Sequence, residues 1–136
     1  MSNIEGLAEK VLHDLHWVGI AEVPTTTYSE SSMEGYVDVL VSDSSGMGVG
    51  FSIDVSGTEA SVLYQLADRI PDAYVELCSV GLPVVPGSHR PARPRLTQNE
   101  VIWEDPDESG TWQCRVGAYP GPISGTSSRQ APGARS

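Results

Sequence analysis

Apolar residues near the N-terminus recur with the period of an α-helix. One stripe of a 3.6-residue repeat contains Ile4, Leu7, Ala8, Val11, Leu12 and Leu15, which predicts a helix over these residues. Ser2 or Asn3 is suited to cap its start, because a short polar side chain can accept a hydrogen bond from a free backbone N–H. Gly19 can end the helix with a left-handed residue.

A second stretch of helical period follows in the middle of the chain. It opens with the sequence of a capping box at residues 56–59 and closes at Gly81. Its apolar stripe consists of Leu63, Leu66, Ala67, Ile70, Tyr74 and Leu77. Pro71 lies inside this stripe, and a proline there removes one hydrogen bond and clashes with the preceding turn. We expect a kink at Ile70 or a helix that restarts at Pro71.

The segments between these helices have the pattern of strands. Residues 21–28 are rich in threonine and include Pro24, which predicts an edge strand or an extended lead-in. Residues 36–41 are rich in β-branched side chains, and residues 49–55 alternate between apolar and small or polar side chains. The glycine-rich residues 43–50 lack the Lys-Ser/Thr of a phosphate-binding loop and lead into a strand. We interpret them as a hairpin turn.

The chain changes character after the second helix. Residues 82–94 contain four prolines and can form neither a helix nor a central strand. Two short strands are predicted over 100–104 and 111–116. We expect an acidic α+β core at 1–80, a proline-rich segment and hairpin packed on it at 81–119, and a disordered tail at 120–136.

These elements predict an α+β fold of order α-β-β-β-α. The antiparallel sheet carries both helices on one face, and a proline-rich crossover leads to a C-terminal β-hairpin. The formal charge of −10, from 18 acidic and 8 basic side chains, argues against a nucleic-acid partner. No apolar stretch approaches the ~20 residues that span a bilayer, so we expect no membrane partner. The N-terminus has no signal-peptide pattern, and we expect a cytoplasmic protein.

The charge is spread unevenly along the chain. Residues 1–80 hold 13 acidic residues against Lys10 and Arg69, whereas residues 81–136 hold six arginines against five acids. Exposed acids on the first helix are the candidates for contact with a basic protein partner, namely Glu5, Glu9 and Asp14. All three are expected to lie off the apolar stripe.

One basic cluster, flanked by aromatic residues, is the best candidate for a ligand site. It consists of His89, Arg90, Arg93 and Arg95, together with Trp103 and Trp112. Arginine beside aromatic rings can bind phosphate, carboxylate or single-stranded nucleic acid. The alternative, which we prefer, is that these arginines pair with the acidic first 80 residues and hold the hairpin on the domain.

The C-terminal half resembles a family of small actinobacterial proteins of uncharacterised function. The family motif Cys-Pro-Gly-His-x-His-Pro corresponds here to residues 85–91, and its Trp-x-Cys-Pro motif to residues 103–106. The cysteine and histidine positions of the family are occupied by Val85, Ser88, Arg90 and Asp105. The resemblance therefore implies that a zinc site, which needs about four N or S ligands, is absent from this chain.

The remaining chemistry is sparse. His13 and His16 are three residues apart, but no third metal ligand is evident, so we interpret them as surface histidines. Cys78 and Cys114 are expected to be thiols. We expect neither a metal nor a cofactor.

Three functions remain open. The first is a non-catalytic interaction protein, such as an accessory, immunity-type or phage-encoded regulatory factor, that binds a protein partner through its acidic surface. The second is a binding module for a small anionic or nucleic-acid ligand that uses the arginines and tryptophans. The third is a small enzyme whose site assembles only in the fold. No nucleophile or phosphate-binding motif is present, which favours the first.

Overall fold

The computed structural model describes residues 3–16, 22–78, 83–88, 90–107 and 112–121. Its helices and strands are α1 (Ile4–Leu15), β1 (Thr25–Glu30), β2 (Tyr36–Ser42), β3 (Gly48–Asp54), α2 (Glu59–Cys78), β4 (Arg93–Leu96), β5 (Val101–Glu104) and β6 (Gln113–Arg115). The α+β class and the order of the first five elements are confirmed.

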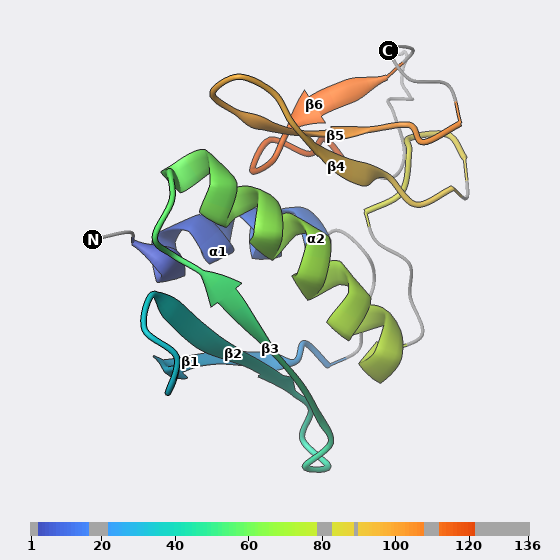
Figure 1. Ribbon diagram of the computed structural model, residues 1–136. Coiled ribbons are helices and arrows are strands. Elements are labelled where there is room, and N and C mark those ends of the chain that lie inside the picture. The colour runs from blue at the N-terminus through green and yellow to red at the C-terminus, as the bar shows by residue number, and fades with distance from the viewer. Residues whose placement is uncertain (1–2, 17–21, 79–82, 89, 108–111, 122–136) are drawn as a thin grey trace.

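The two helices lie between two antiparallel three-stranded sheets. One sheet has the order β1-β2-β3 and the other the order β4-β5-β6. Figure 1 shows the first sheet on one side of the helices and the second sheet on the other. A single hydrophobic cluster includes Leu7 of α1, Val39 of β2, Leu66 of α2 and Trp103 of β5, so the second sheet shares the core of the first.

Helix α1 follows the predicted pattern. Asn3 caps it, and its side-chain Oδ1 accepts a hydrogen bond of 3.0 Å from the N–H of Gly6. The described part of the helix ends at Leu15, with His16 as C-cap, and Gly19 lies outside the described residues. The apolar stripe is buried against α2 and the sheets from Leu7 to Leu15.

Helix α2 differs from its prediction at its start. Its N-cap is Thr58, whose Oγ1 accepts from the N–H of Ser61 at 3.1 Å. The Ser56 hydroxyl donates to Asp54 Oδ1 instead, so Ser56 is not the N-cap that the capping box at 56–59 predicted. The helix is continuous through Pro71, so of the two outcomes expected there, a kink at Ile70 or a restart at Pro71, the restart does not occur. Ile70, Pro71 and Tyr74 are all buried, and this packing offsets the backbone hydrogen bond that proline cannot donate.

The first sheet is an antiparallel meander, in which β1 pairs with β2 and β2 pairs with β3. β1 begins just after Pro24, and the pairing with β2 extends as far as Glu30 opposite Val37. The glycine-rich segment is the β2–β3 hairpin loop, closed by a hydrogen bond of 2.9 Å from the N–H of Asp43 to the carbonyl oxygen of Met47. Gly46 adopts a φ of +95° there, which favours glycine.

The second sheet contains a strand that the sequence pattern did not predict. The expected hairpin is present as β5 and β6, and β4 adds a third strand next to β5. β4 contains Pro94 and lies at the edge of its sheet, where a residue without an N–H is tolerated. Of the predicted disordered tail, residues 122–136 lie outside the described residues.

Candidate functional site

The predicted arginine cluster is engaged by acidic residues of its own segment. Arg90 Nη2 lies 2.6 Å from Asp105 Oδ2, and Arg90 Nε lies 3.4 Å from Asp107 Oδ2. The Nε atoms of Arg93 and Arg95 lie 3.0 and 2.8 Å from the two carboxylate oxygens of Glu104. The prediction that these arginines pair with the acidic first 80 residues is therefore wrong.

Strand register explains this pairing. Arg93 lies directly opposite Glu104 in the β4–β5 pair, and Arg95 lies opposite Ile102. Residues two apart on a strand share a face, so both arginines lie beside Glu104 and cover its side chain, which is fully buried. The cluster therefore fastens the short edge strand β4 to β5.

The two tryptophans of the predicted ligand patch also pack within the protein. Trp103 is fully buried and cannot stack on a ligand. Trp112 is partly buried and packs edge-to-face on Tyr119, with ring centroids 6.2 Å apart. His89 lies outside the described residues. The structure therefore does not gather the five described residues of this patch around one open site.

Asp14, predicted to be exposed, is instead fully buried. Its Oδ2 accepts hydrogen bonds from Trp103 Nε1 at 2.7 Å and from the Gly117 N–H at 2.6 Å, and its Oδ1 accepts from the Tyr119 N–H at 3.1 Å. Asp14 follows Leu7 by seven residues and Val11 by three, which places it on the buried face of α1. It joins α1 to the C-terminal sheet and cannot contact a partner.

The other two acids of the first helix are exposed as predicted. Glu5 and Glu9 are on the solvent side of α1, and both lie near Tyr28 of β1. Burial, followed by the charges of Glu9 and Glu5, raises the pKa of Tyr28 to about 12. The phenol therefore stays neutral at physiological pH.

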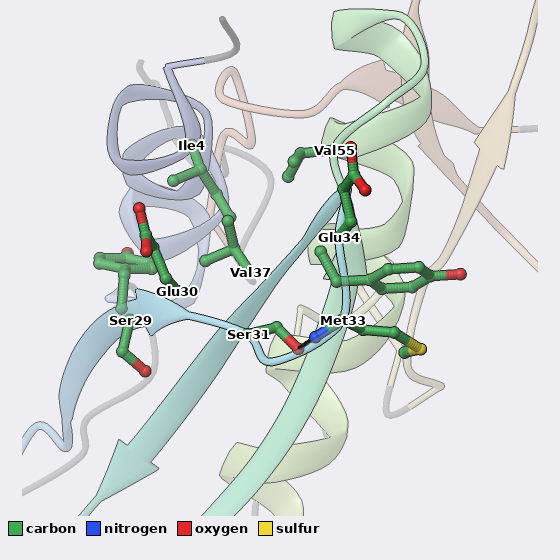
Figure 2. Close-up of a pocket in the computed structure, with 11 residues that line it drawn as sticks. Ile4, Ser29, Glu30, Ser31, Met33, Glu34, Val37 and Val55 are labelled. Carbon is green, nitrogen blue, oxygen red and sulfur yellow. Dashed lines mark hydrogen bonds between the residues drawn. The ribbon is translucent and has the colours of Figure 1, made fainter.

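A pocket of about 490 Å³ opens next to these residues. It lies where the β1–β2 loop meets the start of α1 and the end of β3. In Figure 2, Ile4 and Val37 lie between Glu30 on one side and Glu34 on the other, and Val55 lies beside Glu34. Tyr28, Met33 and Tyr36 also line the pocket. This arrangement combines an apolar interior with carboxylates at its margin.

Sequence reasoning did not find this pocket. Its walls come from three segments that the pattern treats separately, and none of them carries a recognisable motif. One feature of the sequence could have indicated it: Met33 lies between the acids Glu30 and Glu34 in a short loop. Met33 is exposed, and an exposed large apolar side chain beside charges is typical of a contact surface.

The rest of the described residues offer little for chemistry. His13 and His16 are exposed, and His13 Nδ1 lies 2.9 Å from Asp14 Oδ1. Within the described ranges, no three histidine, cysteine, aspartate or glutamate side chains are placed to hold a metal ion. Cys78 and Cys114 are free thiols, and burial, followed by the charge of Asp14, raises the pKa of Cys114 to about 12.

Comparison with protein-family models, with curated proteins and with solved structures gives no match to this chain. None of the helices in the described part of the chain is long and apolar enough to cross a membrane.

Proposed function

We propose that this protein is a non-catalytic binding protein that engages a basic protein partner through an acidic surface formed by Glu5, Glu9, Glu30 and Glu34. Such a protein would be an accessory, immunity-type or phage-encoded regulatory factor. The proposed surface contains Glu30 and Glu34 of the β1–β2 region in place of the predicted Asp14, which is buried.

One observation carries the proposal. Glu5, Glu9, Glu30 and Glu34 are exposed, and among the described residues none of them forms an ion pair. By contrast, Glu100, Glu104, Asp105 and Asp107 of the second sheet are all paired with arginines. The acids of the C-terminal sheet thus serve the fold, while those around α1 and β1 are available to a partner.

The electrostatics of the whole chain support the same conclusion. A net charge of −10 produces a negative field that repels nucleic acid and attracts basic proteins. Complementary charges of this kind accelerate association and are screened by salt over a Debye length of ~8 Å at physiological ionic strength.

The test is affinity capture from an extract of the native host with two charge-reversed variants. Glu30→Lys/Glu34→Lys should lose the basic protein that the wild-type chain retains. The control Asp68→Lys/Glu76→Lys changes the net charge equally on the exposed side of α2 and should retain it. Equal capture by wild type and both variants would contradict the proposal, as would a captured partner that is acidic.

A second candidate function is the binding of a small anion by Arg93 and Arg95. Their side chains are still 55% and 47% exposed, and two guanidinium groups share the single carboxylate of Glu104. Each is held through Nε, so the Nη atoms can face an anion. Titration with inorganic phosphate, followed by amide chemical shifts of β4, should show saturable changes. Changes that persist in Arg93→Ala/Arg95→Ala would exclude this site.

A further inference from the structure

The pocket beside the acidic surface is preformed by its own loop. In the β1–β2 loop, Ser31 Oγ accepts a hydrogen bond from the Met33 N–H at 3.0 Å, and the Tyr36 N–H donates to the Met33 carbonyl oxygen at 3.2 Å. Gly35 adopts a φ of +84°, and its carbonyl oxygen accepts from the Val55 N–H at 2.9 Å. These bonds hold the loop against the end of β3, so a ligand need not order it on binding.

The interior of this pocket suits an apolar side chain. Ile4 and Val37 line the pocket and lie between the carboxylates of Glu30 and Glu34 (Figure 2). Met33 is 53% exposed at its margin, which leaves apolar surface in water that an incoming side chain would cover.

The acidic residues around the opening indicate that the partner segment carrying the apolar side chain is basic. Glu30 and Glu34 flank the opening on opposite sides (Figure 2), and Glu5 and Glu9 lie near Tyr28 in the pocket wall. Cations on both sides of a central apolar residue would match this pattern. A second copy of the chain does not fit, because its own net charge is −10 and like charges repel.

We propose that the pocket is the anchor site for one apolar side chain of a partner protein, presented by an extended segment with lysine or arginine on either side of it. The inference rests on the proposed function and specifies the partner's contact. β1, whose residues Tyr28 to Glu30 line the pocket, is an edge strand, so an extended segment can run alongside it.

The probes are three synthetic peptides titrated into the ¹⁵N-labelled full chain and followed by amide chemical shifts. The first is Arg-Lys-Leu-Lys-Arg, the second replaces leucine by alanine, and the third replaces all four cations by glutamate. The first should shift the amides of Gly35, Val37 and Val55 and bind about tenfold more tightly than the second, because the leucine side chain leaves water. The third should not bind.

Two matched variants locate the anchor. Met33→Ala should weaken the leucine peptide about threefold and leave the alanine peptide unchanged, because it removes apolar wall from the pocket. Met47→Ala makes the same change at a methionine that is 65% exposed in the β2–β3 loop and should affect neither peptide. Both side chains are largely in water, so neither substitution should impair folding.

The outcomes separate the two proposals. If the leucine and alanine peptides bind equally and both weaken in Glu30→Lys/Glu34→Lys, the acidic surface stands and the anchor is overturned. If neither basic peptide responds to this charge reversal, both proposals fail. If phenethylammonium, a small organic cation with an apolar ring, binds as tightly as the leucine peptide, the pocket is a small-molecule site and the segment proposal is overturned.

Discussion

Replacing Asp14 by alanine should destabilise the protein strongly, because its carboxylate joins α1 to the C-terminal sheet. The substitution removes the acceptor of three N–H donors, those of Trp103, Gly117 and Tyr119, at 2.6 to 3.1 Å. Each donor left without a partner away from water costs about 1–3 kcal/mol. The hydrogen bond of the Gly117 N–H is only part-buried, and this donor can turn to water, so we expect a total loss of about 3–5 kcal/mol rather than the full sum.

Two further variants serve as comparisons for the loss of stability in Asp14→Ala. Asp14→Asn keeps one carbonyl oxygen as an acceptor, but its amide N–H then faces one of the donors. The loss in free energy of unfolding should therefore be smaller than that of Asp14→Ala. Glu9→Ala removes an exposed acid from the same helix and should change the free energy of unfolding by no more than ~0.5 kcal/mol.

The assay is urea unfolding followed by tryptophan fluorescence, with Trp103 as a reporter inside the affected region. For a chain of this length, the expected loss lowers the melting temperature by roughly 10–20 °C. Hydrogen exchange of the Gly117 and Tyr119 amides should also accelerate in both Asp14 variants. If Asp14→Ala is as stable as Glu9→Ala, the assigned role of Asp14 is wrong.

Three other predictions concern the ion pairs of Glu104, the partly buried thiol of Cys114 and the zinc content of the protein. Arg93→Ala/Arg95→Ala removes two cationic partners of the buried Glu104. Because both guanidinium groups are about half exposed, the free energy of unfolding should fall by about 1–3 kcal/mol, less than the ~3–5 kcal/mol of a fully buried pair. An unchanged urea midpoint would show that the ion pairs are not stabilising. Burial raises the pKa of Cys114 from its ordinary value of 9.0 to about 12. The stability contributed by its neutral form is complete below pH 9 and is lost as the pH rises toward 12. The urea concentration at the midpoint of unfolding should therefore decrease as the pH is raised from about 9 to 11, and this decrease should be smaller in Cys114→Ala. Elemental analysis of the purified protein should find no stoichiometric zinc, and about one zinc per chain would refute the interpretation of the degenerate Cys/His positions.

Local periodicity was sufficient to predict most of the fold. The stripe from Leu7 to Leu15 identified α1, and alternation at residues 49–55 identified β3, because both elements bury one face against the same core. β4 escaped prediction since its four residues include Pro94, and its stability depends on register with Glu104 in the next strand.

The candidate site was harder to predict because it depends on contacts between distant residues. Asp14 and Trp103 are 89 positions apart, so no local pattern indicates that one carboxylate will be buried while Glu9, on the same helix, stays in water. The partners of the arginines were mispredicted for the same reason: the strand register that places Arg93 and Arg95 beside Glu104 was unknown.

The most direct test of the acidic surface is the association rate of the wild-type chain with its captured native partner as a function of ionic strength. We expect the rate constant to fall steeply between about 20 and 500 mM salt, because screening shortens the Debye length across this range. The slope should be reduced in Glu30→Lys/Glu34→Lys and retained in Asp68→Lys/Glu76→Lys. An association rate that does not change with salt, or a slope that is the same in all three proteins, would contradict the proposed function.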